Sequence, residues 1–305
     1  MKDRISIAIA TYNGSKYLRE QLESIYTQSL PPHEVVVSDD CSTDNTIEIL
    51  EEYKNAHGLC YITNTQNVGF TRNFEKAILM ATGEYVLPCD QDDIWLPDKI
   101  RILYDAIKEK EEEEENHNLP GLVCSHTINI DEHGHETCRI NTREKGWDYL
   151  LYAHYTQGCT LIMNRKLIQL VLPIPDGIMY DVYIGMVAAM CGFWYNNGLP
   201  LVKYRCHESN VMNKKVKRRD TQGVLPFILG ESRFDTMRTV ERCHGDRFLP
   251  HKKELFYRIY SYCNYSGAPD CKKQTFLQQF SEKLISAVFG KEDSAFWLDF
   301  LLLCQ

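Results

Sequence analysis

The sequence predicts a doubly wound, mostly parallel α/β sheet flanked by helices and followed by a helical C-terminal extension. Four strand-like apolar runs alternate with amphipathic helical segments within the first 93 residues, and each run leads into a cluster of polar residues. Such alternation is typical of a parallel sheet with helical crossovers. Past about residue 210 the alternation stops, so we expect the sheet to end there.

The first three strands and helices follow one another at short intervals. "RISIAIA" stays apolar as a buried parallel strand does, and "TYNGS" supplies the turn into the helix "KYLREQLESIYTQ". The strand "EVVVS" ends at Asp39 and Asp40, and the capping residues of "STDNT" precede the helix "IEILEEYKN". The strand "CYIT" and the loop "NTQNVG" lead into a helix that starts near Phe70 and that Gly83 ends.

The fourth strand, "EYVL", leads into "CDQDD". Right-handed crossovers bring the carboxyl ends of parallel strands to one edge of the sheet, where ligands bind in such folds. The polar clusters "TYNG", "DDCSTD", "NVGFTRN" and "DQDD" all follow strands. We therefore expect them to line one site.

The remaining elements are less regular. A helix bearing Ile100, Leu103 and Ile107 is expected, then the strand "LVCSHTINI" and the turn "DEHG", whose His133 and His135 we interpret as ordinary surface residues. "QGCTLIMN" is predicted to be a strand, and "RKLIQLVL" and "YDVYIGMVAAMCG" are predicted to be helices. A hairpin is predicted around "NNG", ending in "YRCHESN".

Composition narrows the class of protein. At 305 residues and 44% hydrophobic, the chain can form one large core with a smaller part appended. No apolar stretch reaches the roughly 18 residues of a membrane-spanning helix, and the first apolar run is too short and too early for a signal peptide. We therefore expect a cytoplasmic chain that begins at its first residue. The 12 cysteines include no C-x-x-C pair, which argues against a zinc framework and favours reduced thiols.

The charge is distributed unevenly. Residues 1–209 carry 18 Lys and Arg against 31 Asp and Glu, whereas residues 210–305 carry 16 against 11. The acidic run 108–116 is interpreted as a solvated helix end. The basic "KKVKRR" at 214–219 precedes the apolar "GVLPFILG", a combination that could lie on an anionic membrane surface. The ending "AFWLDFLLLCQ" either adds a second apolar contact or packs on the domain, and no nucleic-acid partner is expected.

Several nucleotide-binding and hydrolytic designs are excluded by missing motifs. No two glycines are separated by a single residue, and the one Gly-Lys pair, at 290 and 291, is followed by Glu. A G-x-G dinucleotide turn and a P-loop are therefore absent. The patterns G-x-S-x-G and H-E-x-x-H do not occur either.

The "CDQDD" segment places Asp90, Asp92 and Asp93 within five residues. Carboxylates this close repel one another, so the arrangement is costly unless a positive group lies among them. A divalent cation is the main candidate. The alternative is a solvated turn in which Asp93 caps the following helix.

The order of "TYNG", "SDDCSTDNT", "NVGFTRNF" and "ATGEYVLPCDQDD" resembles that of family-2 glycosyltransferases, which have the GT-A fold. The resemblance covers roughly residues 4–210. It implies a GT-A domain over 1–210, with a nucleotide-sugar half to about 115 and an acceptor half over 116–210. The region 211–305 lies outside it and is expected to be mainly helical.

The resemblance implies a cation site. The family's D-x-D element matches Asp90, Gln91 and Asp92, which would hold Mn²⁺ or Mg²⁺ against the donor diphosphate. Arg72 resembles the family's basic residue near the diphosphate, although an arginine that points to solvent from an amphipathic helix would look the same. His207, in "YRCHESN", resembles a histidine that closes the site and touches the metal or the diphosphate, and its alternative is a structural role.

The resemblance also implies a base site and a catalytic base. Thr11 and Tyr12 would lie by the nucleotide base, with Asp39 accepting a hydrogen bond from a pyrimidine imide. Asp40 would instead orient the loop, and the sequence leaves the roles of the two acids open. Asp181 matches the family's catalytic base. The alternative is an exposed Asp in the first turn that only interacts favourably with the helix dipole.

The later motifs "QGCTLIMN", "YDVYIGMVAAMCG" and "YRCHESNV" together resemble those of bacterial rhamnosyltransferases of surface polysaccharide pathways. This branch usually has His before the catalytic Asp and an aromatic pair after it, whereas this chain has Tyr180 before it and Val182 and Tyr183 after it. The implied reaction is an inverting transfer of a sugar, with rhamnose as the first choice, from a dTDP- or UDP-sugar to a saccharide or lipid-linked saccharide. A UDP-hexose donor, a sugar nucleotidyltransferase and a non-catalytic scaffold are the alternatives.

Overall fold

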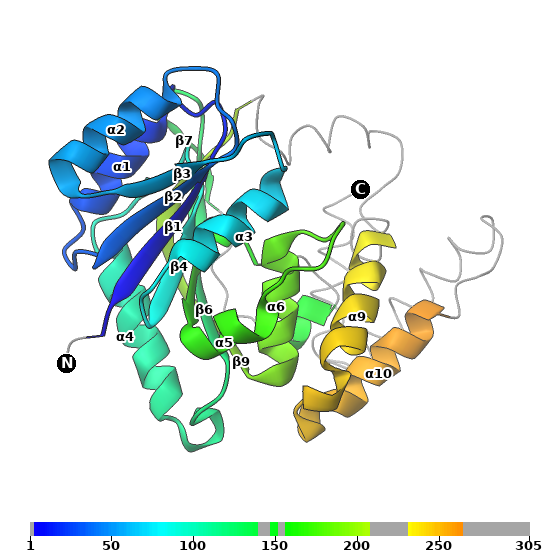
Figure 1. Ribbon diagram of the computed structural model, residues 1–305. Coiled ribbons are helices and arrows are strands. Elements are labelled where there is room, and N and C mark those ends of the chain that lie inside the picture. The colour runs from blue at the N-terminus through cyan, green and yellow to red at the C-terminus, as the bar shows by residue number, and fades with distance from the viewer. Residues whose placement is uncertain (1–2, 140–146, 152–155, 208–230, 265–305) are drawn as a thin grey trace. The chain divides into compact units, whose positions relative to one another are not determined.

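The computed structural model describes residues 3–139, 147–151, 156–207 and 231–264 (Figure 1). The chain divides into two compact units, Met1–His207 with Thr239–Leu249 and Glu208–Arg238 with Pro250–Gln305. The predictions for segments 214–219, 223–230 and 295–305 concern residues outside these ranges. Of the described helices, none is both long and apolar enough to cross a membrane.

The first four strands form a parallel sheet in the order β3, β2, β1, β4. The strands are β1 (Ile5–Thr11), β2 (Glu34–Asp39), β3 (Cys60–Thr63) and β4 (Tyr85–Cys89), and the helices between them are α1 (Leu18–Tyr26), α2 (Thr46–His57) and α3 (Phe70–Met80). In Figure 1, α1 and α2 lie on one side of the sheet and α3 on the other. The prediction of a doubly wound sheet is confirmed.

The second half of the sheet is mixed. Beyond β4 the order continues β8, β6, β9, β5, where β8 is antiparallel to both of its neighbours and β9 is parallel to β6. The strands are β5 (Ile94–Trp95), β6 (Gly121–Ile130), β7 (Glu136–Arg139), β8 (Leu161–Asn164) and β9 (Phe193–Arg205). The α-helices are α4 (Lys99–Glu112), α5 (Arg165–Val171), α6 (Tyr180–Cys191), α9 (Glu231–His244) and α10 (Pro250–Asn264), and the short 3-10 helices are η1 (Glu114–Asn116), η2 (Trp147–Leu151), η3 (Gly158–Thr160) and η4 (Gly245–Arg247).

The predicted hairpin around "NNG" is wrong, because residues 193–205 form one strand. The pairing with β6 passes from Cys124 opposite Asn196 to His126 opposite Pro200, so β9 bulges by two residues. Side chains of Asn196 and Asn197 accept hydrogen bonds from the backbone N–H groups two residues later, and Gly198 adopts a φ of 72°. These turn contacts are local, and the chain continues along the same partner strand.

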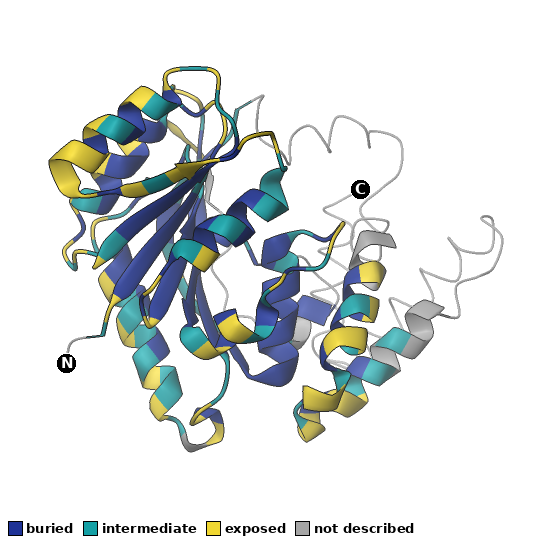
Figure 2. Ribbon diagram, in the orientation of Figure 1, coloured by how far each residue is buried: buried dark blue, intermediate teal, exposed yellow. Residues whose placement is uncertain are grey.

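The sheet forms the centre of the core. Figure 2 shows buried residues along the central strands and over most of α6. The helices α1, α2 and α4 contribute Leu22, Leu50 and Leu103 to one apolar cluster with the sheet, and each of these side chains is fully buried. On the other face, Phe74 of α3 stacks on Tyr180 of α6 with ring centroids 4.2 Å apart.

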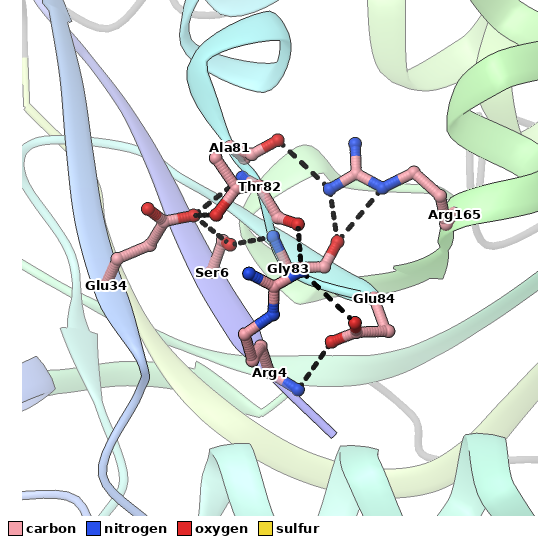
Figure 3. A network of polar contacts seen from close by, with 8 residues as sticks. All are labelled: Arg4, Ser6, Glu34, Ala81, Thr82, Gly83, Glu84 and Arg165. Carbon is pink, nitrogen blue, oxygen red and sulfur yellow. Dashed lines mark hydrogen bonds and ion pairs between the residues drawn. The ribbon is translucent and has the colours of Figure 1, made fainter. Parts of the chain in front are cut away.

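Polar contacts fix the amino end of the sheet, at the turn between α3 and β4 (Figure 3). The Glu34 carboxylate accepts hydrogen bonds from Ser6 Oγ and Thr82 N, both at 2.6 Å. Burial alone would raise the pKa of Glu34, but these hydrogen bonds lower it. Arg165 donates from Nε to the Gly83 carbonyl at 3.0 Å and from Nη2 to the Ala81 carbonyl at 3.0 Å.

Candidate functional site

The carboxyl ends of β1 and β2 meet at a buried pair, Thr11 and Asp39. Thr11 Oγ1 donates to Asp39 Oδ1 at 2.8 Å, and the backbone N–H of Ser42 donates to Asp39 Oδ2 at 2.9 Å. Asp39 is fully buried, whereas the neighbouring Tyr12 leaves 49% of its surface exposed. An exposed aromatic residue therefore directly follows Thr11, the residue that donates to the enclosed carboxylate.

Asp40 holds the loop that follows β3. Its carboxylate accepts hydrogen bonds from Asn64 Nδ2 at 3.0 Å and from the backbone N–H groups of Val68 at 2.8 Å and Gly69 at 2.9 Å. All three donors belong to the segment 64–69. These contacts match the second of the two roles that the sequence left open for the adjacent acids, in which Asp40 orients the loop.

Gln91 joins the ends of β1 and β4. Its side-chain amide pairs with the backbone of Tyr12, accepting from the N–H at 2.8 Å and donating to the carbonyl at 3.0 Å. A Cβ added to Gly14 would lie 2.2 Å from Gln91 Oε1, so a side chain at position 14 would displace the amide. The middle residue of the D-x-D element therefore fixes the position of Tyr12.

Asp93 is fully buried, and its Oδ1 accepts a hydrogen bond from the backbone N–H of Arg205 at 3.0 Å. The helix α4 begins only at Lys99, and the residue before it is Asp98. The alternative in which Asp93 caps this helix from a solvated turn is therefore wrong.

The carboxylates next to β4 repel one another. Burial, followed by the charges of Asp93, Asp92 and Asp181, raises the pKa of Asp90 well above its usual range. Burial and the charge of Asp92 raise the pKa of Asp93 to about 7. Ionisation of all these carboxyl groups is therefore unfavourable unless a positive charge lies among them, which favours a cation.

Lys99 lies fully buried near this acidic cluster. Its Nζ donates to the Cys159 carbonyl at 2.6 Å and lies 3.1 Å from the centroid of the Trp95 ring. Burial lowers the pKa of Lys99 to about 7, although Asp93 and Asp90 oppose the shift. Lys99 therefore supplies only part of the missing positive charge near neutral pH.

Ligand atoms of Asp90, Asp93 and Cys159 lie within 4.8 Å of one another, close enough to hold a metal ion. This set shares Asp90 with the set expected from the sequence, which was Asp90, Asp92 and His207. Cys159 belongs to η3 and is fully buried. Burial raises the pKa of its thiol well above the usual range, so the thiol is protonated at neutral pH unless a metal binds.

His207 and Asp92 are brought together although they lie 115 residues apart in the chain. His207 Nε2 lies 2.8 Å from Asp92 Oδ2, and the two side chains are only 12% and 14% exposed. The ring of His207 also lies against Tyr17, with centroids 5.1 Å apart. An imidazole and a carboxylate of the acidic cluster are thus in direct contact.

Asp181 lies in the first turn of α6 and is 6% exposed. The alternative of an exposed first-turn carboxylate is therefore wrong. Its Oδ1 accepts a hydrogen bond from the backbone N–H of Val182 at 2.9 Å. Because its charge raises the pKa of Asp90, Asp181 lies within electrostatic reach of the D-x-D element.

Arg72 is directed to a different segment. It donates from Nη1 to the Ile174 carbonyl at 2.7 Å and forms ion pairs with Glu75 and Asp176. The side-chain hydrogen bonds with Asp176 and Glu75 raise the pKa of Arg72. These contacts join α3 to the 174–176 segment, and they do not include the residues of the acidic cluster.

Three residues of the site had no role in the sequence interpretation: Arg205, Lys99 and Cys159. Each has its polar partner far away in the chain, so local patterns carry no signal for it. Lys99 looks like an ordinary lysine at the start of a helix. Arg205 offered the only hint, because it stands two residues before His207 in a segment that was already of interest.

Comparison with known proteins identifies the family. The profile described as "Glycosyl transferase family 2" matches residues 6–170, which is more than half of the chain. The dTDP-rhamnosyl transferase RfbG of Shigella flexneri is 27% identical over 227 residues, covering 68% of this chain and 74% of RfbG. The poly(ribitol-phosphate) beta-N-acetylglucosaminyltransferase TarS of Staphylococcus aureus is 43% identical over 95 residues, covering 30% of this chain and only 16% of TarS.

Solved structures share the fold at low identity. The structure of S. aureus TarS 1–349 in complex with UDP-GlcNAc has a TM-score of 0.62 and 20% identity, over 93% of this chain and 81% of that one. The mannosyltransferase PcManGT from Pyrobaculum calidifontis in complex with GDP-Man and Mn²⁺ has a TM-score of 0.52 and 17% identity, over 97% of this chain and 83% of that one. Taken with the family profile, these likenesses show that the chain belongs to glycosyltransferase family 2 and has the GT-A fold.

Proposed function

We propose that the protein is an inverting, metal-dependent glycosyltransferase that moves a sugar from a nucleoside-diphosphate donor to a hydroxyl of a bacterial surface polysaccharide or lipid-linked oligosaccharide. One observation carries the proposal. The charge of Asp181, at the start of α6, acts on Asp90 at the end of β4, and His207 meets Asp92 at 2.8 Å. The proposed general base and the acidic cluster thus lie within electrostatic range of each other, as a transfer between two bound substrates requires.

The nucleotide base is assigned to the ends of β1 and β2. Tyr12 is half exposed, so its ring is available to contact a planar base. Thr11 donates a hydrogen bond to Asp39, and Asp39 is proposed to accept the pyrimidine imide hydrogen bond. Because Asp39 is fully buried, this contact requires Tyr12 or Ser42 to shift when the donor binds.

The cation site is assigned to Asp90, Asp92 and His207, with Mn²⁺ or Mg²⁺ as the ion. The residues fit such an ion, because burial and the neighbouring acids raise the pKa of Asp90, so its ionised form gains from a positive charge, and carboxylate oxygens suit hard cations. When bound, the cation would neutralise charge on the departing nucleoside diphosphate. Arg72 is proposed to assist there, which requires it to leave Asp176, an exposed partner whose ion pair is weak.

Asp181 is the proposed general base. Its carboxylate takes the proton of the acceptor hydroxyl while that oxygen attacks the anomeric carbon. The bond between the anomeric carbon and the nucleoside diphosphate breaks on the opposite face, so the configuration inverts. The hydrogen bond from Val182 N to Oδ1 orients the carboxylate.

The donor is proposed to be dTDP-rhamnose, by analogy with RfbG, the relative that matches most of both chains. TarS supports a second candidate, UDP-GlcNAc, because TarS is more similar to this chain over its shorter match and a solved structure of TarS 1–349 holds UDP-GlcNAc. The two donors differ in both nucleotide and sugar, so a binding measurement separates them.

The domain division predicted from the sequence, 1–210 and 211–305, remains part of the proposal. So does peripheral contact of the C-terminal region with a membrane on the cytoplasmic side, which rests on the basic segment 214–219 and the apolar segment after it. Contact of this kind would bring the site to a lipid-linked acceptor.

The proposal is tested by Asp181→Asn. We expect release of dTDP from dTDP-rhamnose, or of UDP from UDP-GlcNAc, to fall by ~100-fold or more with water as acceptor, because an amide cannot take the proton. Binding of the nucleotide should change by less than about twofold. The matched control is Asp105→Asn, an exposed change of the same chemistry on α4. Unchanged release in Asp181→Asn would refute the assignment.

A further inference from the structure

Arg205, the last residue of β9, is a fully buried arginine with 2% of its surface exposed. A guanidinium in such a place is costly unless its donors are satisfied. Its Nε donates to the Asp92 carbonyl at 2.9 Å, and its Nη1 donates to the Glu132 carbonyl at 3.1 Å. Its Nη2 forms an ion pair with the carboxylate of Glu20. One side chain therefore joins the D-x-D element, the turn after β6 and the helix α1.

The backbone around Arg205 is tied to the same element. Its N–H donates to Asp93 Oδ1 at 3.0 Å, and Lys203 pairs with Ile94 in the antiparallel contact between β9 and β5. The next residue, Cys206, donates its N–H to the Ile130 carbonyl at 2.8 Å. The end of β9 is thus held against the segment 92–94 by both side-chain and backbone contacts.

His207 follows immediately and depends on this anchor. Its ring reaches Asp92 at 2.8 Å and lies 5.1 Å from the ring of Tyr17. The guanidinium of Arg205 lies 4.6 Å from the centroid of the same Tyr17 ring. Arg205 therefore contacts both surfaces that the His207 ring touches, namely the Asp92 segment and Tyr17.

We propose that Arg205 is a positioning residue that holds His207 against Asp92. The significance of this pair rests on the proposed function, in which Asp92 and His207 bind the cation. A lysine cannot replace the arginine, because an ammonium has no planar fork with which to reach Asp92, Glu132 and Glu20 at once. The role is geometric, and Arg205 is not proposed to touch the donor.

The first test uses the metal-free protein. In the wild type, ring protons of His207 and Tyr17 should show a nuclear Overhauser contact. Arg205→Met and the milder Arg205→Lys should lose most of this signal while the protein remains folded by circular dichroism. The control is Arg165→Met, which removes hydrogen bonds to the Ala81 and Gly83 carbonyls at the other end of the sheet (Figure 3) and should keep the signal. A retained signal in folded Arg205→Lys would overturn the proposal.

The second test is a double-mutant cycle on Mn²⁺-dependent binding of UDP and dTDP. Arg205→Lys should weaken binding by about tenfold in the wild-type background and by less than about twofold in the His207→Ala background, because it acts through His207. Equal weakening in both backgrounds would overturn the inference and leave the proposed function standing. If no nucleotide binds but the Overhauser result is as expected, the proposed function fails and the positioning role stands.

Discussion

At the scale of single residues, the site is dominated by buried charge. Asp93 and Lys99 are both fully buried, and burial moves the pKa of each toward 7, upward for the acid and downward for the lysine. The two groups therefore change charge in the range where cells operate. A protein tolerates this cost where a bound cation restores the balance.

The Asp93 shift makes stability depend on pH. The unfolded chain releases this proton near its ordinary pKa of 3.8, whereas the folded chain keeps it up to about 7. Between these values the folded state binds more protons, so stability falls as the pH rises. An Asn at position 93 stays neutral and can still accept the hydrogen bond from the Arg205 N–H. The difference in Tm, wild type minus Asp93→Asn, should therefore decrease as the pH is raised from about 4 to about 7. The change corresponds to on the order of 1–4 kcal/mol.

Thermal unfolding in the presence of a chelator measures this effect without bound metal. The Tm of Asp105→Asn, on the exposed face of α4, should differ from that of the wild type by a constant amount over the same pH range. If the Tm of Asp93→Asn also differed from that of the wild type by a constant amount, the buried carboxylate would have an ordinary pKa.

At the scale of elements, the position of α6 depends on η3. A Cβ added to Gly158 would lie 1.7 Å from the Tyr180 hydroxyl and 2.6 Å from its Cζ. Tyr180 stacks on Phe74, so its ring cannot move without disturbing the contact between α3 and α6. Glycine at position 158 therefore allows Tyr180 to lie where it does, next to the proposed base Asp181.

Gly158→Ala should destabilise the protein by about 1–3 kcal/mol, the usual effect of overpacking, and should lower donor turnover by displacing the start of α6. Adding Tyr180→Phe to Gly158→Ala removes the hydroxyl and leaves only the smaller overlap between the alanine Cβ and the ring. The free energy of unfolding is measured in urea for the two single variants and the double variant. The double variant should lose less stability than the sum of the two single losses. Strict additivity would mean that the two residues do not press on each other.

Elements with local signals could be predicted from the sequence, and those set by distant partners could not. The strands β1 to β4 carry apolar runs that end in polar clusters, so their order and the location of the candidate site were predictable. The asparagines in β9 favoured a hairpin, but pairing with β6 decided the structure. Arg205 and Lys99 were missed because their partners lie 113 and 60 residues away in the chain.

At the scale of the whole molecule, the fold gathers one site from segments that span most of the described chain up to His207. Tyr12, Asp39, Asp92, Asp181 and His207 lie within or next to five different elements. Their convergence at the carboxyl end of the sheet is what the family membership leads one to expect. The central claim is that this place binds a nucleoside diphosphate with a divalent cation.

Calorimetric titration with dTDP, UDP and GDP, each with and without Mn²⁺, tests that claim most directly on the wild type, Asp92→Asn and the control Asp105→Asn. The account predicts Mn²⁺-dependent binding of dTDP or UDP that is unchanged in the control and weakened by about tenfold or more in Asp92→Asn, the effect of losing a charged ligand. Absence of binding by all three nucleotides, with and without Mn²⁺, would contradict it and leave the acidic cluster as a structural feature.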